Sequence, residues 1–244
     1  MKFDLHMHTI YSDGRPTPRE VLEIAKAKEI GVSITDHNQI KGAIIAQDIA
    51  INENLPFICG MELGTCEGKE MLVYFSDAGG AEEFYIKEVE PYLTNRITRI
   101  SRPMWEFVGE RFADMKKEYQ ISFTTIPHPF GVLYKSVKSD VELSKEILNM
   151  VDAVEVINAS MSEKANQKAY LLAKELSKFK MASTDAHLKK SIGNVTTKVK
   201  FDENGGILNT DISHNFHLDS LLTTSLSLLQ ITQKNFTHSI LKMQ

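Results

Sequence analysis

Short apolar segments alternate with longer amphipathic segments over most of the chain, and this alternation predicts strands and helices in turn. The expected strands begin at Phe3 and continue with 32–35, 55–59, 71–75, 121–126, 153–158 and 181–184, and the expected helices cover 18–30, 40–52, 141–150 and 163–178. The stretch 80–118 is long, charged and helical in pattern. Repeated alternation of strand and helix indicates an α/β barrel with parallel strands.

The first helix has the clearest start signal. Thr17-Pro18-Arg19-Glu20 has the form of a capping box with proline at the first helical position. A strand at 32–35 follows the helix, so the first strand-helix-strand unit is of the size expected for a right-handed parallel crossover.

The first strand carries His6 and His8, and it leads into the turn residues Ser12-Asp13-Gly14. Residues two apart on a strand point the same way, so the two imidazoles would lie side by side and could grip one metal ion. The turn would present the Asp13 carboxylate beside them. Taken alone, the same pattern fits a strand that carries two histidines without any metal.

The other polar residues at strand ends favour the metal interpretation. His37, His128 and His187 each follow a short apolar segment, and Asp36, Glu62 and Asp185 occupy matching positions. Parallel strands bring their carboxyl ends to one mouth, so these side chains would converge. A mixed set of imidazoles and carboxylates suits Zn, Mn or Fe, and the sequence therefore predicts a multinuclear metal site.

Composition adds limits to this picture. The 244 residues are 42% hydrophobic and 25% charged, with a net charge of -4, which is ordinary for one globular domain and provides no strong surface for nucleic acid. Two cysteines, Cys59 and Cys66, are too few for a disulfide framework. We see no signal peptide and no membrane-spanning segment, and we expect a cytoplasmic protein.

Three residues are candidates for substrate binding. Arg99 and Arg102 belong to a basic cluster with Arg96, and Asn158 ends the strand 153–158. Arginines near a metal site can clamp phosphate, although on a helix they more often form a solvated face.

The character of the chain changes near residue 200. Residues 202–206 have loop chemistry, and Leu218 to Met243 is an apolar helical stretch. We expect 1–200 to form the catalytic barrel and 201–244 to form an extension, a loop and a helix packed on it. His214, His217 and His238 lie outside any strand-end pattern and are expected to be surface or packing residues.

Taken together, the motifs resemble the PHP (polymerase and histidinol phosphatase) family of metal-dependent phosphoesterases. The resemblance is carried in family order by His6-x-His8 with Ser12-Asp13-Gly14, Thr35-Asp36-His37, Gly60-x-Glu62, His128-Pro129, Glu155-x-x-Asn158 and Asp185-x-His187. It implies a distorted (β/α)7 barrel with two or three divalent ions at the carboxyl ends of the strands, and hydrolysis of phosphate esters. The chain looks most like the small stand-alone members.

The resemblance also implies a distribution of ligands. One ion would take His6, His8, Glu62 and Asp185, a second would take Glu62 and His128, and a third would take Asp13, His37 and His187. Where many relatives place a histidine before the fourth strand, this chain has Glu70. A carboxylate there would make the second site harder and more like a Mn or Mg site.

The expected reaction is attack of a metal-activated water on a phosphate ester, with Glu62, Asp185 and His187 as the catalytic residues. The expected partner is a small phosphorylated substrate or a nucleotide, and oligomeric state is left open. Two alternatives remain. A C–N bond hydrolase of the amidohydrolase type shares the His-x-His strand, and a regulatory module with a weakened site is suggested by Glu70.

Overall fold

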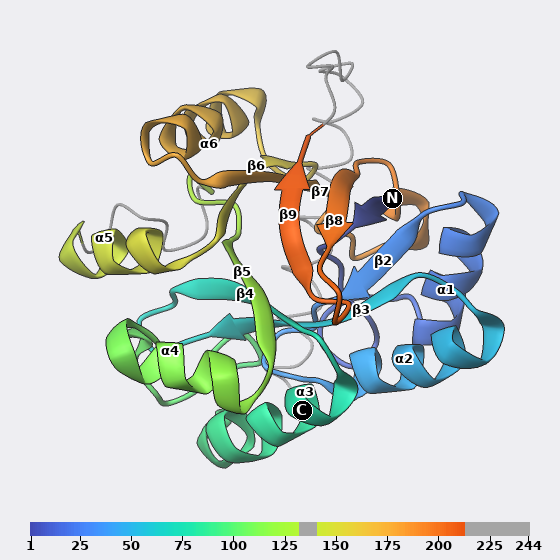
Figure 1. The fold of residues 1–244 in the computed structure, drawn as a ribbon, viewed down its shortest axis with the longest axis horizontal. Helices are drawn as coiled ribbons and strands as arrows, with labels where there is room; N and C mark the ends of the chain where they lie inside the picture. The colour runs from blue at the N-terminus through green and yellow to red at the C-terminus, as the bar shows by residue number, and fades with distance from the viewer. Residues whose placement is uncertain (132–140, 213–244) are drawn as a thin grey trace.

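The computed structural model describes residues 1–131 and 141–212, and its elements follow the predicted order (Figure 1). The strands are β1 (Lys2–Asp4), β2 (Gly31–Ile34), β3 (Phe57–Gly64), β4 (Glu70–Phe75), β5 (Ile121–Ile126), β6 (Ala153–Asn158), β7 (Phe179–Ser183), β8 (Thr197–Phe201) and β9 (Ile207–Asp211). The α-helices are α1 (Pro18–Ala27), α2 (Lys41–Glu53), α3 (Ala78–Phe84), α4 (Gly109–Glu118), α5 (Val141–Met150) and α6 (Glu163–Glu175). Thr17 caps α1 with the predicted capping box.

The strands form one sheet in the order β7-β6-β5-β4-β3-β2-β1-β8-β9. A parallel bridge between Met7 and Ala186 joins the chain just beyond β1 to the chain just beyond β7, so the sheet is nearly closed into a barrel. The fold therefore confirms the predicted distorted barrel. β8 and β9 form an additional antiparallel hairpin that the pattern did not predict.

One strand of the barrel runs against the predicted direction. β4 is antiparallel to both β3 and β5. The connection from β3 to β4 covers only residues 65–69, whereas a parallel pair needs a crossover of about a dozen residues or more. The prediction of a wholly parallel sheet was therefore wrong at β4.

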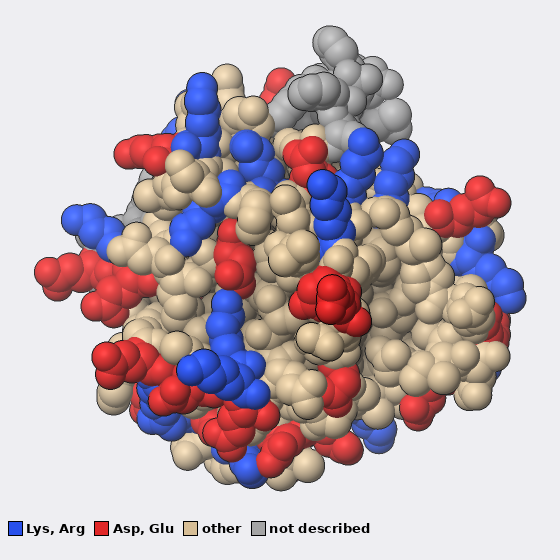
Figure 2. Space-filling view, viewed as in Figure 1, with Lys and Arg blue, Asp and Glu red and all other residues tan. Residues whose placement is uncertain are grey.

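Two apolar layers fill the fold. The larger one lies between the sheet and the helices, which surround the sheet in Figure 1. The smaller one draws only on strands and on Leu5 just beyond β1, so it is the barrel interior, and it includes Tyr74, Val199 and Ile207. The hairpin β8–β9, which crosses the barrel in Figure 1, thus contributes Val199 and Ile207 to the interior. Figure 2 shows side chains of both charge signs interspersed on the face that carries this hairpin.

The stretch 80–118 is not one helix. After α3 the chain makes a π-helical turn (Tyr85–Val89) and a 3-10 turn (Glu90–Tyr92), and helix resumes only with the 3-10 turn Met104–Phe107 and α4. Pro91 lies at the first interruption, where a missing N–H and a fixed φ end a helix, and Pro103 directly precedes the 3-10 turn at which helix resumes. Between them Leu93 and Ile100 pair in an antiparallel bridge that closes a loop.

The expected helix from Leu218 to Met243, with the histidines at 214, 217 and 238, lies outside the described residues. Within the described ranges, every helix is too short or too polar to cross a bilayer.

Candidate metal centre

The two histidines of the first motif lie side by side, as the strand pattern predicts. Their ring centroids are 5.2 Å apart, and both side chains are fully buried. The chain that carries them is held on both sides, because Thr35 N donates to Met7 O and His8 N donates to Ala186 O, each at 2.9 Å. Leu5 packs in the barrel interior while Met7 packs in the outer layer, since the regular strand ends at Asp4.

Four side chains from three strands, His6 and His8 after β1, Glu62 on β3 and Asp185 after β7, bring their donor atoms close together. His6 Nε2 lies 3.5 Å from Glu62 Oε2 and 3.6 Å from Asp185 Oδ1. His8 Nε2 lies 3.4 Å and 3.2 Å from the same two oxygens. Donor atoms held about 2.1 Å from one tetrahedral ion would be about 3.4 Å apart, so this set fits a bound transition metal.

The burial of these atoms supports the same fit. His6 Nε2 is inaccessible to solvent and makes no hydrogen bond within the described part of the chain, and the equally buried Glu62 Oε2 pairs with His37 Nδ1 at 2.9 Å. A buried polar atom without a hydrogen bond costs free energy unless another partner satisfies it. A divalent cation is a partner that both an imidazole nitrogen and a carboxylate oxygen accept.

A second group shares Glu62. Its other oxygen, Oε1, lies 3.2 Å from His128 Nε2, and Glu70 Oε2 lies 3.7 Å from the same nitrogen. Glu70 is the first residue of β4 and pairs with Gly64, so the short hairpin brings it back beside the end of β3. The structure therefore places the unusual Glu70 carboxylate beside the cluster.

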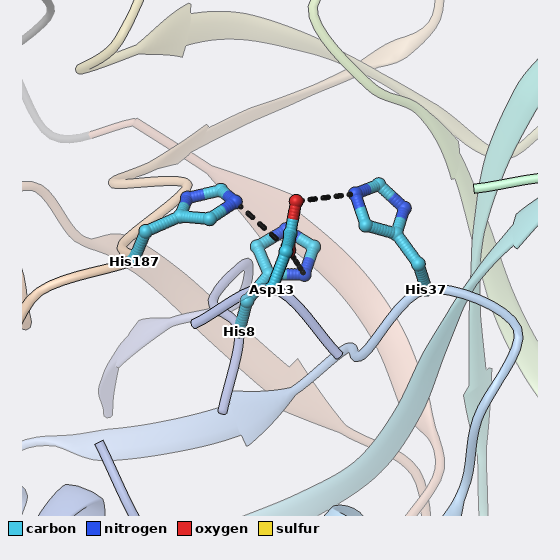
Figure 3. A group of neighbouring side chains, drawn as sticks. All are labelled: His8, Asp13, His37 and His187. Carbon is cyan, nitrogen blue, oxygen red and sulfur yellow. Dashed lines mark ion pairs between the residues drawn. The ribbon is translucent and has the colours of Figure 1, made fainter. Parts of the chain in front are cut away.

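The third group surrounds Asp13, as Figure 3 shows. Asp13 Oδ1 lies 3.1 Å from His187 Nε2 and 3.7 Å from His8 Nδ1, and Asp13 Oδ2 lies 3.7 Å from His37 Nε2. The turn that delivers Asp13 needs glycine next to it, because a Cβ on Gly14 would come within 2.1 Å of His8 O.

Burial and mutual contact set the charges of the centre. Burial, together with the neighbouring His187 and His37, lowers the pKa of His8 to about 3, so His8 is neutral at pH 7. Burial alone would raise the pKa of Glu62, but His37 and His6 outweigh it and hold that pKa well below the usual range. Neutral imidazole and ionised carboxylate are the forms that bind metals.

Two buried carboxylates, Asp36 and Asp4, hold the turns beside the cluster in place. The sequence analysis did not assign this supporting role to them. Asp36, expected among the strand-end carboxylates, accepts hydrogen bonds from Thr9 N, Thr9 Oγ1 and Ser12 Oγ. It therefore fixes the turn that leads to Asp13, and it is in none of the described metal-ligand groups. Asp4 accepts from Thr184 N and Oγ1 and so fixes the turn at Asp185. Burial raises the pKa of both, that of Asp4 to about 6.

The structure does not favour substrate contact for Arg102 or Asn158. Arg102 is 3% exposed, and its guanidinium pairs with Glu88 and Glu106. Asn158 is fully buried, and its Nδ2 donates to Glu155 Oε2 at 2.9 Å while Oδ1 accepts from Ser160. Both side chains are committed to neighbouring protein groups, which is the reason to revise these two expectations.

Arg99 has a different setting. It is partly exposed on the loop between Leu93 and Ile100. Asn38, which directly follows His37, ties this loop to the centre by donating from Nδ2 to Ile97 O at 3.1 Å and accepting from Gly64 N at 2.8 Å. Arg99 thus belongs to a loop anchored at the metal-centre end of β2 and β3.

Comparison with known proteins finds relatives in sequence and in fold. The chain is 34% identical over 89 residues to an uncharacterized protein of Methanocaldococcus jannaschii, covering 32% of this chain and 52% of that protein. It is 36% identical over 67 residues to the 3',5'-nucleoside bisphosphate phosphatase of Chromobacterium violaceum, covering 27% of this chain and 24% of the phosphatase. The aligned part is thus about half or less of each curated relative.

Solved structures share the fold at low sequence identity. PsfC of Pseudomonas syringae matches with a TM-score of 0.63 and 17% identity, over 96% of this chain and 98% of that one. The lesion-specific endonuclease PfuEndoQ of Pyrococcus furiosus matches with a TM-score of 0.57 and 21% identity, over 82% of this chain and 53% of the nuclease. Residues 4–204 match the PHP domain, and because this match covers most of the sequence, the chain belongs to the PHP family.

Proposed function

We propose that the protein is a hydrolase that uses two or three divalent metal ions to cleave a phosphate ester. The observation that carries the proposal is the set of four converging donor atoms on His6, His8, Glu62 and Asp185, whose nitrogen-to-oxygen distances of 3.2 to 3.6 Å match those of ligands on one ion. Membership of the PHP family supports it.

The remaining ligands follow the other two groups. Glu62 Oε1, His128 and Glu70 would hold a second ion, and Asp13, His37 and His187 would hold a third, with His8 beside them. Bound divalent ions would supply a water nucleophile that is activated near neutral pH and would neutralise the phosphate oxygens. The donor set of imidazoles and carboxylates suits Mn, Fe or Zn.

The protein groups act by orientation. His187 Nδ1 lies 2.9 Å from Asp185 O, and because a carbonyl only accepts, that nitrogen carries the proton and leaves Nε2 free to face Asp13. His187 is therefore better suited to metal binding than to proton transfer. Asp185 Oδ1 faces the histidine pair, while Oδ2 accepts from Ser160 Oγ at 2.9 Å, which fixes the carboxylate plane.

The proposed substrate is a small phosphorylated compound or a nucleotide. The relative in Chromobacterium violaceum is a nucleoside bisphosphate phosphatase, and PfuEndoQ is an endonuclease, so each is named for action on phosphate esters. Arg99 is the candidate for contact with the substrate phosphate, because it lies on the loop anchored at Asn38.

The test is hydrolysis by protein stripped with chelator and reloaded with Mn, Fe or Zn. Phosphomonoesters, phosphodiesters and amides should be assayed in parallel, because an amidohydrolase would act on the last class. We expect phosphate release that depends on added metal. Amide cleavage without phosphate release would contradict the proposal, and a protein that binds metal but cleaves neither class would support a binding module instead.

A further inference from the structure

Glu155 is a fully buried carboxylate in the middle of β6 that belongs to none of the described metal-ligand groups. Its Oε1 accepts hydrogen bonds from His6 Nδ1 and Ser183 Oγ, and its Oε2 accepts from His128 N and Asn158 Nδ2. A carboxylate offers about four lone-pair sites, so these protein donors fill its capacity. Glu155 is therefore placed to orient other groups rather than to bind a metal itself.

One oxygen of Glu155 sets the proton position on His6. The distance from His6 Nδ1 to Glu155 Oε1 is 3.0 Å, and because a carboxylate can only accept, Nδ1 must be the donor. In the neutral ring the lone pair then lies on Nε2, the atom that faces Glu62 Oε2 and Asp185 Oδ1. The opposite tautomer would direct an N–H at the cluster and could not ligate an ion.

The other oxygen holds the backbone at His128. Glu155 Oε2 accepts from His128 N at 2.7 Å, and His128 has a φ of 29°, a left-handed conformation that is uncommon outside glycine. This backbone directs the ring so that Nε2 lies 3.2 Å from Glu62 Oε1. His6 and His128 serve the two different groups that share Glu62, and one carboxylate supports both.

We propose that Glu155 is a positioning residue that controls metal binding in these two adjacent sites together, through the tautomer of His6 and the backbone of His128. The inference rests on the proposed metal-dependent function. It goes further by assigning a joint effect to a residue that is not a ligand. A hydrogen-bonded partner behind a ligand typically changes metal affinity about 10- to 100-fold when it is removed.

The variant Glu155→Gln tests this directly, because an amide cannot replace all four accepting contacts. If its oxygen faces His128 N, its NH2 group faces His6 Nδ1 and forces the proton to Nε2. If its oxygen faces His6, its NH2 group opposes the N–H of His128. In either orientation one of the two histidines loses its support.

The matched control is Asp152→Asn. Asp152 directly precedes β6 and accepts from Thr124 N at 2.8 Å, Thr124 Oγ1 at 2.9 Å and Lys116 Nζ at 2.8 Å, and none of these three donors belongs to the metal-ligand groups of the described residues. It applies the same carboxylate-to-amide change beside the same strand. A general loss of stability would affect both variants, whereas a loss of metal affinity should follow Glu155 alone.

The experiment measures Mn and Zn affinity of the full-length protein by competition with a chelator, together with the histidine ring tautomers by 15N NMR of metal-free protein. We expect Glu155→Gln to bind at least one of the two equivalents about 10- to 100-fold more weakly, because one histidine loses its support, and Asp152→Asn to bind as the wild type does. Unchanged affinity in Glu155→Gln would overturn the proposal.

A wild-type measurement keeps the test decisive if Glu155→Gln does not fold. Burial lowers the pKa of His6, but Glu155, Asp185 and Glu62 outweigh it and hold that pKa well above its usual value, so the spectrum is recorded at a pH high enough to make the ring neutral. Neutral His6 should then carry its proton on Nδ1, and a proton on Nε2 would overturn the proposal without any variant. Failure of the proposed function looks different: the wild type would then bind no divalent ion, while the His6 tautomer could still be the expected one.

Discussion

Replacement of Glu70 by alanine should remove one protein ligand from the second metal site. Glu70 Oε2 lies 3.7 Å from His128 Nε2, which in turn lies 3.2 Å from Glu62 Oε1. Two donor atoms on an ion about 2.1 Å away lie at most about 4.2 Å apart, so His128 is close enough to share an ion with Glu62 and also with Glu70. Glu70 and Glu62 also belong, with His37, to one group of donor atoms within 4.8 Å of one another. Removal of a residue that only supports a ligand weakens metal affinity about 10- to 100-fold. Loss of the ligand itself should therefore weaken binding at this site about 100-fold or more.

The size of the effect on stability follows from mass action. At a free metal concentration of 100 times Kd, the site stabilises the folded protein by about 2.7 kcal/mol, and a Kd weakened 100-fold reduces this to about 0.4 kcal/mol. The difference of about 2.3 kcal/mol corresponds to a fall in Tm of about 5 to 9 °C for a chain of this length. In chelator the variant should be no less stable than the wild type, because Glu70 then only adds negative charge near Glu62.

The assay is thermal unfolding at buffered Mn concentration, with metal content measured on the same samples. Glu67→Ala is the matched control, since Glu67 lies in the same hairpin but accepts a hydrogen bond from Met104 N instead of facing His128. Glu70→His should shift the preference from Mn toward Zn. If Glu70→Ala keeps the wild-type stoichiometry and the wild-type metal-induced rise in Tm, Glu70 is not a ligand.

Other substitutions separate binding, catalysis and stability. His8→Ala should lose bound metal and activity together, and inactivity at full metal content would disprove its role as a ligand. Arg99→Ala should raise KM with an unchanged Tm. Arg102→Ala should leave KM unchanged but lower stability by about 1.5 to 3 kcal/mol, because it removes charged hydrogen bonds to the half-buried Glu88 and Glu106. The reverse pattern would restore Arg102 as the phosphate contact. Of the two cysteines, Cys66 is exposed and should react with a maleimide at pH 8. Burial raises the pKa of Cys59 to about 12, so Cys59 should not react. Equal rates for the two thiols would contradict the burial of Cys59.

The sequence predicted that the histidines and carboxylates of the candidate centre converge, because their positions obey a simple rule of geometry. His37 and Asp185 follow parallel strands, and parallel strands end on the same side of a sheet, so distant residues could be placed together without coordinates. Glu62 follows the same rule near the end of β3, where it forms a parallel bridge with His37.

The features that sequence reasoning missed depend on tertiary contacts. Arg96, Arg99 and Arg102 have helical spacing, yet the chain there is a loop and turns, so the spacing carries no common face. Glu155 and Asp4 support the ligands from inside the sheet. A charged residue within the apolar strand 153–158 was the available signal for Glu155, but its partners His6 and His128 are distant in sequence.

Titration of metal-free protein with Mn, with bound metal and hydrolysis of a nucleotide phosphate ester measured on the same samples, tests the central claim most directly. The account predicts that hydrolysis is absent without metal and rises as the sites formed by His6, His8, Glu62 and Asp185 fill. It also predicts that His6→Ala binds fewer equivalents and stays inactive over the same range. Hydrolysis that persists in fully chelated protein, or that is unchanged in His6→Ala, would contradict it.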